Sequence, residues 1–165
     1  MPQPFERHVV LVSPEIHWNT GNIGRTCLGA GAYLHLIKPL GFSLADREVK
    51  RAGLDYWDQV NLSVWTNFAE FSEKIGSSLS DAVVLTKTGS QPVWQIPKTA
   101  SRLFLFFGSE TRGLPPAIQQ AFRPDQTYHI PIGRPIRSLN LSTAVGIALY
   151  ESLREAPDFH QWAAY

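Results

Sequence analysis

The chain has 165 residues, of which 44% are hydrophobic and 18% charged, and its formal net charge is +1. This length and hydrophobic content predict one folded domain with a buried core, and they exclude an intrinsically disordered chain, which would carry more charge and less apolar surface. A net charge this close to zero predicts that any contact with nucleic acid depends on local clusters of basic residues.

The N-terminal segment and the cysteine content indicate the compartment. Residues 1–7 lack the basic and then apolar order of a signal peptide, and no apolar stretch approaches the ~20 residues that span a bilayer. The single cysteine, Cys27, excludes an intrachain disulfide and is typical of a reducing environment. We therefore expect a cytoplasmic protein without a membrane segment.

Six short apolar runs predict β-strands, because they are rich in β-branched or aromatic residues and are bounded by Pro, Gly or Asp. In chain order they are residues 8–12, 33–37, 61–65, 82–85, 103–107 and 128–132. Helical patterns lie between them, at residues 20–30, 68–75, 115–122 and 141–153, and the segment 46–54 is a candidate for a further short helix.

This alternation of strands and helices predicts an open α/β domain, with a mostly parallel sheet and helices on both faces. The near-continuous apolar character of residues 8–12, 82–85 and 103–107 is typical of strands that are covered on both sides. We expect a single domain over residues 1–165, with a core from about residue 8 to 155 and a short aromatic tail that contains Phe159, Trp162 and Tyr165.

The last predicted helix carries a broad apolar face. Leu141, Val145, Leu149 and Leu153 form one row at a spacing of four residues. The row has two interpretations, which are packing against the sheet of the same chain and contact with a second subunit.

Three turn-rich segments follow predicted strands directly, at residues 19–25, 108–114 and 130–142. Loops at strand ends in α/β folds are where ligand sites form, because the sheet holds the otherwise mobile backbone in place. Glycines in such loops allow the backbone to approach a ligand, and arginines supply fixed positive charge for anionic groups. The three segments therefore predict one composite site.

The first segment predicts a helix start that favours anions. Asn19 or Thr20 is the expected N-cap, and the free N–H groups of the first turn suit a phosphate. Arg25 follows about one and a half turns later, either pointing toward the strand ends or lying in solvent as an ordinary surface arginine.

The second and third segments contain further polar side chains beside glycine and proline. In the second, Pro115 or Pro116 suits the first turn of a helix, and Glu110 and Arg112 either serve the site or pair with each other. In the third, Asn140 is the expected N-cap of the last helix, and Ser138 is placed to hydrogen-bond a ligand.

Taken together, these segments resemble the SpoU-type branch of the SPOUT methyltransferases, and most closely its small single-domain TrmL group. The resemblance extends from His8 to about Glu155, and it is carried by residues 14–16, 19–25, 51–56, 108–115 and 137–142. It implies an α/β-knot fold with a C-terminal trefoil knot. It also implies a homodimer that uses S-adenosylmethionine to 2′-O-methylate the wobble pyrimidine, cytidine or uridine 34, in the anticodon arm of leucine tRNAs.

The resemblance also implies roles for individual residues. The cofactor site would be formed by Leu85, Gly108, Ile130, Ser138 and Leu139, and the catalytic site by Arg25 with Asn19, Glu110 and Asn140. A guanidinium hardly loses its proton, so we interpret Arg25 as orienting a phosphate and stabilising negative charge on the 2′-oxygen, rather than as a general base. RNA phosphates would contact the basic residues Arg47, Lys50, Arg51, Arg134 and Arg137.

No metal is expected, because the five histidines lack metal-ligand spacing. Two features depart from the family pattern. His17 and Trp18 replace the Pro-Pro that often precedes Asn19, which alters the RNA-facing loop, and Lys87 lies one place earlier than the family lysine, so we assign it no role.

Three other functions compete with this interpretation. The first is the same chemistry on another ribose of tRNA or ribosomal RNA, and the second is a non-catalytic RNA-binding module. The third, a Rossmann nucleotide site at residues 29–31, is disfavoured because these residues lie at a predicted helix end rather than in a strand-to-helix turn.

Overall fold

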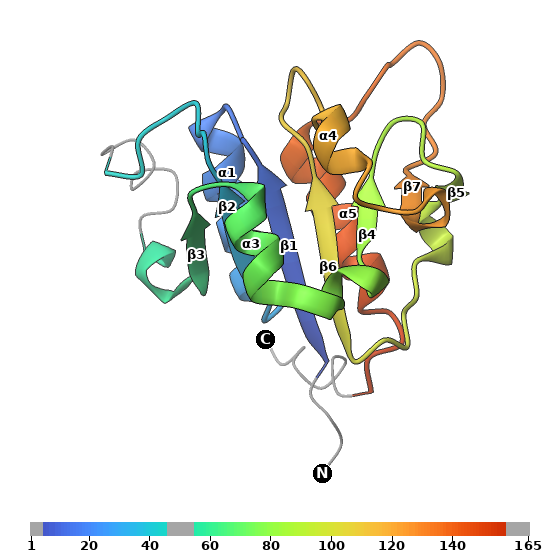
Figure 1. Cartoon of the computed structure of the whole chain (residues 1–165), viewed down its shortest axis with the longest axis horizontal. Coiled ribbons are helices and arrows are strands. Elements are labelled where there is room, and N and C mark those ends of the chain that lie inside the picture. Colours follow the sequence, from blue (N-terminus) through green and yellow to red (C-terminus); the bar gives the residue numbers. More distant parts are fainter. Residues whose placement is uncertain (1–4, 46–54, 158–165) are drawn as a thin grey trace.

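Seven strands form one parallel sheet in the computed structural model, which describes residues 5–45 and 55–157 (Figure 1). The strands are β1 (Glu6–Val12), β2 (Tyr33–Ile37), β3 (Leu62–Trp65), β4 (Val83–Leu85), β5 (Gln91–Pro92), β6 (Arg102–Phe107) and β7 (Thr127–His129). Their order across the sheet is β3-β2-β1-β6-β4-β7-β5, and every neighbouring pair is parallel. The predicted open parallel sheet is confirmed.

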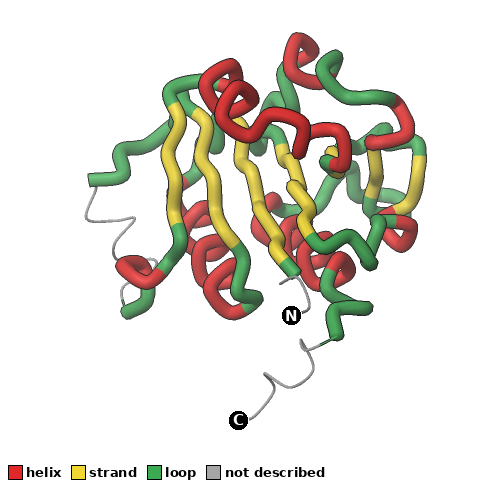
Figure 2. Tube along the Cα trace, turned by 60° about the horizontal axis from the view of Figure 1, so that its bottom comes forward, coloured by secondary structure: helices red, strands yellow, loops and turns green. Residues whose placement is uncertain are grey.

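Helices cover both faces of this sheet (Figure 2). On one face, Ile23 and Val145 pack into an apolar cluster with Val9, and on the other Phe71 packs with Val10. Successive residues of β1 thus serve opposite cores, which explains its continuous apolar sequence. The helices are α1 (His17–Gly29) and α5 (Leu141–Ser152) on the first face, and α3 (Phe68–Ile75) and α4 (Pro116–Gln119) on the second.

Four short 3-10 helices connect these elements, namely η1 (Trp57–Gln59), η2 (Gly76–Asp81), η3 (Val93–Gln95) and η4 (Pro124–Gln126).

Several predicted boundaries were wrong. The strand predicted at 128–132 ends at His129, since Pro131 has no N–H for a sheet ladder. The helix predicted at 115–122 is regular only over α4, and the chain then turns toward Pro124. The two-residue strand β5 was not predicted, because it is too short to show a pattern. The candidate helix at 46–54 and the aromatic residues Phe159, Trp162 and Tyr165 lie outside the described residues.

The apolar row on α5 packs against the sheet of its own chain. Val145 and Leu149 are fully buried and Leu153 is nearly so, all within the core on that face. The first interpretation of this row is therefore confirmed. Tyr150 is 46% exposed on the same helix, so part of α5 also faces outward.

Arg7 closes the end of the sheet opposite the predicted site. Arg7 is 1% exposed, and its guanidinium donates to the carbonyl oxygens of Ser152, Ala100, Lys98 and Glu6 at 2.8–3.3 Å. Burial lowers the pKa of Arg7 to about 10, so the side chain stays charged at neutral pH. It thereby ties the start of β1 to the end of α5.

A chain of buried polar groups crosses β1, β2 and β3 on the α3 face. The Trp65 indole N–H donates to His35 Nδ1 at 3.1 Å, so His35 Nε2–H donates to His8 Nδ1 at 3.0 Å. His8 Nε2 then faces Glu6 Oε2 at 3.4 Å. Burial, and secondarily nearby positive charge, lowers the pKa of His8 from 6.5 to about 4 and that of His35 to about 3. Both imidazoles are therefore neutral at physiological pH.

These two histidines make stability depend on pH. Because both pKa values are lowered by folding, the unfolded chain binds more protons below pH 6.5, so the free energy of unfolding should fall as pH decreases. The decline should reach at most about 1.4 kcal/mol per pH unit for each histidine. Urea unfolding between pH 7 and pH 4.5 measures it, in a window above the lowered pKa values of Glu15 and Glu151.

The matched control is the double variant His8→Leu, His35→Leu, measured over the same range. Its unfolding free energy should be nearly independent of pH, whatever its absolute stability. An unchanged slope in the double variant would contradict the assignment.

Candidate active site

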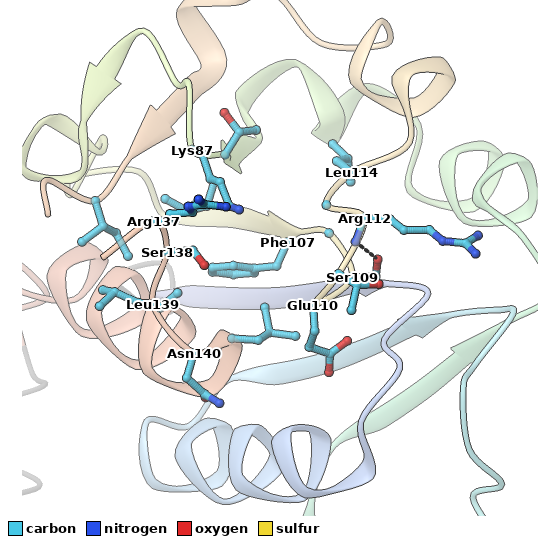
Figure 3. Close-up of a pocket in the computed structure, with 18 of the residues that line it drawn as sticks. Lys87, Phe107, Ser109, Glu110, Arg112, Leu114, Arg137, Ser138, Leu139 and Asn140 are labelled. Atoms are coloured by element: carbon cyan, nitrogen blue, oxygen red, sulfur yellow. Dashed lines mark hydrogen bonds between the residues drawn. The ribbon is translucent and has the colours of Figure 1, made fainter. Parts of the chain in front are cut away.

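A cavity of about 650 Å³ opens at the carboxyl ends of β4, β6 and β7 (Figure 3). The segments after these strands form most of its wall, and the start of α1 adds Ile16 and Asn19. Beside it the order of strands along the chain reverses, since β1 pairs with β2 on one side and with β6 on the other. This is the position where open parallel sheets bind ligands.

The cavity brings together most of the residues predicted for the site. Nine of them line it, and they are Asn19, Leu85, Gly108, Glu110, Ile130, Arg137, Ser138, Leu139 and Asn140. Arg25 and Arg134 do not line it. The predicted RNA-binding residues Arg47, Lys50 and Arg51 lie outside the described residues.

Three of these residues form a continuous hydrogen-bonded chain across the site. Glu110 accepts hydrogen bonds from the backbone N–H groups of Glu15, at 2.7 Å, and Ile16, at 3.1 Å. It also accepts one from Asn19 Nδ2 at 3.2 Å, and Asn19 Oδ1 in turn accepts from Asn140 Nδ2 at 3.1 Å. These hydrogen bonds join all three predicted segments. Asn19 and Glu110 are 91 positions apart in sequence, and Asn19 and Asn140 are 121 positions apart.

The predicted helix caps were half right. Asn140 caps α5 as expected, because its Oδ1 accepts from the Ser142 backbone N–H at 2.9 Å. Asn19 and Thr20 do not cap α1, which begins at His17 after Ile16. They are buried inside its first turns, where Asn19 bonds Glu110 and Asn140 instead.

The alternative pairing of Glu110 with Arg112 was wrong. The Glu110 carboxylate faces the start of α1, whereas Arg112 extends away from it in Figure 3. A second contact ties the same loop to the segment before α1, because Thr111 Oγ1 donates to Glu15 at 2.7 Å. Hydrogen bonds from the Thr111 and Ser109 side chains lower the pKa of Glu15.

The two glycines of the second segment serve the loop itself. Gly113 has φ +67°, as a turn with positive φ requires. A Cβ on Gly108 would lie 2.1 Å from both the Gly113 carbonyl carbon and the Leu114 nitrogen. Gly108 therefore allows its own loop to pack closely against it, at Gly113 and Leu114. It also forms part of the cavity wall.

Gly108→Ala should displace the cavity wall. The new Cβ would clash with backbone atoms of Gly113 and Leu114, which cannot move aside as a flexible side chain can. Overpacking of this kind costs about 1–3 kcal/mol, which lowers the melting temperature by several degrees. Affinity for S-adenosylmethionine, measured by calorimetry, should fall by at least ~10-fold if Gly108 bounds the cofactor site. Gly133→Ala is the control, because a Cβ there meets nothing within 4 Å. Equal affinity in both variants would contradict the role of Gly108.

Comparison with known proteins identifies the family. The model of the SpoU rRNA Methylase family matches residues 6–150, which include every strand and the whole cavity wall. The chain belongs to the SpoU methylase family. The expected resemblance is thereby confirmed.

Individual SpoU relatives are similar over nearly the full chain. A protein from Methylovorus glucosotrophus (strain SIP3-4), named tRNA (cytidine(34)-2′-O)-methyltransferase, is 43% identical over 147 residues, covering 89% of this chain and 94% of its own. A solved structure concerning the 2-OH methylation of C/U34 on tRNA has a TM-score of 0.82 and 42% identity, and covers 92% and 96% of the two chains. An AdoMet-bound rRNA methyltransferase from Sinorhizobium meliloti has a TM-score of 0.81 and 27% identity, covering 94% of this chain and 58% of that one.

In this SpoU chain Arg25 lies on the exposed side of α1. Its guanidinium stacks over the Tyr56 ring, 5.5 Å from the ring centroid. A cation–π contact holds an exposed arginine with about 0.5–1 kcal/mol and leaves its N–H groups free to bind a ligand. The structure does not bring Arg25 to the cavity of its own chain.

Sequence reasoning assigned no role to one cationic group of this SpoU cavity, Lys87, and left the role of a second, Arg112, open. Lys87 and Arg112 line it together with the predicted Arg137. In Figure 3 the side chains of Lys87 and Arg137 extend toward one another on the wall away from Glu110. Neither makes a hydrogen bond or ion pair with another residue that the structure describes. Lys87 follows the end of strand β4 by two residues, and this position is the sequence signal that could have placed it among the predicted site residues.

The described residues contain neither a metal cluster nor a membrane span. No group of three or more His, Cys, Asp or Glu side chains there is placed to hold a metal ion. No helix within residues 5–45 and 55–157 is long and apolar enough to cross a bilayer.

Proposed function

We propose that this protein is an S-adenosylmethionine-dependent tRNA 2′-O-methyltransferase that modifies the wobble pyrimidine, cytidine or uridine 34, of leucine tRNAs. The observation that carries the proposal is the series of hydrogen bonds from Glu110 through Asn19 to Asn140, which fixes three loops around one cavity. The 43% identical relative named for this reaction at cytidine 34 supports the choice of nucleotide.

The cavity suits the cofactor in size and in chemistry. About 650 Å³ lies within the range of small-molecule sites. Leu85, Ile130 and Leu139 supply apolar contacts for adenosine, Gly108 presents main chain, and Ser138 supplies a hydroxyl. S-adenosylmethionine, when bound, supplies a methyl group already activated by its sulfonium. The protein residues then need to hold the 2′-hydroxyl in line with that methyl group, with the hydroxyl proton released to solvent and S-adenosylhomocysteine as the second product.

Arg25 acts on the RNA side of the reaction. Its planar guanidinium can hold a phosphate and the 2′-oxygen together, and it stabilises the negative charge that develops on that oxygen. Because Arg25 does not line the cavity of its own chain, a homodimer accounts for both its position and its role. In that dimer, Arg25 of one subunit serves the cavity of the other. Asn19, Glu110 and Asn140 keep the cavity wall in place.

The RNA-binding surface combines basic residues at the cavity rim. Arg134 is exposed beside the cavity, and Arg137 lines it. We assign phosphate contacts of the anticodon arm to these two residues and to Arg47, Lys50 and Arg51. We also assign this chain a C-terminal trefoil knot formed by the 108–114 and 130–142 segments, and a cytoplasmic location.

A second candidate target is a ribose in ribosomal RNA. The structural likeness to an rRNA methyltransferase from Sinorhizobium meliloti favours it. That relative is longer, however, since the likeness covers only 58% of its chain. The likeness to the structure concerning C/U34 methylation on tRNA covers 96% of that chain at 42% identity, and it therefore supports the tRNA target better.

Mass-spectrometric mapping of 2′-O-methylated nucleosides tests the proposal. The purified protein is incubated with S-adenosylmethionine and either total tRNA or ribosomal RNA that lacks the modification. We expect methylation of nucleotide 34 in leucine tRNAs alone. Methylation of ribosomal RNA would replace the tRNA target by the second candidate, and no methylation of either RNA would overturn the enzyme assignment.

A further inference from the structure

One face of α1 is exposed from its first turn onward. Trp18, Asn22 and Arg25 are all exposed, and their spacing of four and then three residues places them in one row along the helix. Trp18 is 56% exposed, the highest value among the exposed tryptophans that the structure describes. A tryptophan left this open on a helix indicates a binding surface rather than a packing role.

Trp18 is close in sequence to the cavity wall, although it does not line the cavity itself. Ile16, two residues before it, and Asn19, directly after it, both line the wall. In Figure 1, α1 begins at the same end of the sheet as the carboxyl ends of the central strands. A molecule that enters the cavity with part of its structure outside therefore passes close to the indole.

The indole is held in place rather than free in solvent. The His17 ring lies 4.2 Å from it, centroid to centroid, at an interplanar angle of 42°. His17 in turn contacts the Phe42 ring edge-on, at 6.5 Å. These contacts support the indole from one side and leave much of the ring open, so stacking on it would cost little side-chain entropy.

The charge on the same face indicates the chemistry of the ligand. Arg25 lies seven residues after Trp18, which is about 10 Å along the helix axis. An aromatic platform followed by an arginine is typical of surfaces that bind single-stranded nucleic acid, where bases stack and phosphates pair with cations. A purely apolar protein partner would leave the Arg25 guanidinium without a matching charge.

We propose that Trp18 is a stacking platform for an unpaired base of the RNA substrate, next to the nucleotide whose ribose is methylated. The inference rests on the proposed function and adds a specificity-determining residue to it. Trp18 selects RNA in which the neighbouring nucleotide is unpaired and can leave the stack of its own strand. Because a base of any identity has a flat face, the platform recognises an open loop rather than one sequence.

Binding of an anticodon stem-loop RNA with cytidine at position 34 tests this platform. Trp18→Phe keeps a flat ring, whereas Trp18→Leu keeps apolar bulk without one. Stacking on an aromatic side chain contributes about 1–3 kcal/mol per base, so Trp18→Leu should weaken RNA binding by roughly 5- to 150-fold. Trp18→Phe should retain most of the affinity. Near-equal binding by the wild type and Trp18→Leu would overturn the proposal.

Abasic substitutions in the RNA identify the stacked base. Each loop nucleotide other than 34 is replaced in turn by an abasic residue, and its binding to the wild type and to Trp18→Leu is compared. At one loop position, the abasic substitution should weaken RNA binding to the wild type. The same substitution should hardly weaken binding to Trp18→Leu any further, as expected when the base and the indole are two partners in one contact. Independent losses at every position would count against the platform.

Two controls distinguish base stacking from a general loss of binding and from a change in assembly. Tyr33→Leu removes an aromatic side chain that is 39% exposed at the amino end of β2, at the end of the sheet opposite the cavity, and should leave RNA binding unchanged. Sedimentation of Trp18→Leu should match the wild type, since a changed oligomeric state would mean that a second copy covers the indole. If wild-type protein methylates tRNA but Trp18→Leu binds RNA normally, the platform fails while the proposed function stands.

Discussion

Replacing Arg25 with alanine should lower the rate of methyl transfer by about 10²–10³-fold, because a transition state loses one preorganised charged donor. The fold should be nearly unaffected, since Arg25 is exposed and its described contact is with the Tyr56 ring. Affinity for S-adenosylmethionine should also be unchanged, because the side chain does not line the cavity. Single-turnover methylation at saturating tRNA, with melting temperature and cofactor calorimetry, measures all three quantities.

Arg25→Lys is the informative companion to this variant. An ammonium keeps the charge and much of the contact with Tyr56, but it lacks the planar fork that binds two oxygens together. We therefore expect turnover almost as slow as in Arg25→Ala. A structural Arg25 gives the opposite pattern, with a lower melting temperature, little kinetic change and rescue by lysine. Near-normal turnover of Arg25→Ala would remove this residue from the mechanism.

Mixed dimers test whether Arg25 acts across subunits. Arg25→Ala subunits are expected to be nearly inactive alone, and Glu110→Gln subunits to lose at least ~10-fold in methyl transfer. If Arg25 serves the partner's cavity, a mixed dimer contains one complete site, and mixing should restore part of the activity. If Arg25 acts within its own subunit, no combination contains a complete site and the mixture stays inactive.

The strands other than β5 were predictable because each contains a short apolar run, although the end of β7 was not. Residues 33–37 were predicted with their observed limits, and the β1 and β6 predictions missed only the polar residues at the strand start. One of those residues, Arg7, is buried for reasons that no local pattern shows. The Arg7 guanidinium is satisfied by carbonyls up to 145 positions away.

The sequence allowed us to predict which loops form the site, but not which of their side chains contact one another. Asn140 could be identified as a cap because capping depends on neighbours in sequence. The same local reasoning failed for Asn19, whose partners Glu110 and Asn140 are remote in sequence. Ile16, the N-cap residue before α1, makes no side-chain cap, and its backbone N–H donates to Glu110 from another loop. Tertiary contacts therefore replaced the local cap that the sequence favoured.

The position of Glu110 explains why a carboxylate is needed there. Both of its oxygens accept hydrogen bonds, Oε2 from the Glu15 N–H and Oε1 from the Ile16 N–H and Asn19 Nδ2. Every group that faces it is thus a donor. A carboxylate is the common side chain that accepts at both ends, so the loop after β6 can hold the start of α1 with one residue.

Glu110→Gln should accordingly disrupt the site despite its similar size. In either orientation of the amide, its NH₂ group faces an N–H donor and leaves that donor unsatisfied. An unsatisfied buried donor costs about 1–3 kcal/mol, and these donors are only partly buried, so the melting temperature should fall by a few degrees at most. The cavity wall should loosen with it, and we expect at least ~10-fold weaker binding of S-adenosylmethionine by calorimetry and a comparable loss of methyl transfer.

Two further variants determine whether the hydrogen-bond pattern is the cause. Glu15→Gln makes the same chemical change in the same cluster, but the side chains that bond Glu15 are the Thr111 and Ser109 hydroxyls, which can accept as well as donate, so its effect should be small. In the double variant Glu110→Gln, Asn19→Asp, the new amide can donate to the new carboxylate. That swap restores the contact between the two side chains but not the pair of backbone N–H contacts, so we expect partial recovery of cofactor affinity. If Glu110→Gln binds the cofactor as tightly as Glu15→Gln does, this network does not hold the site.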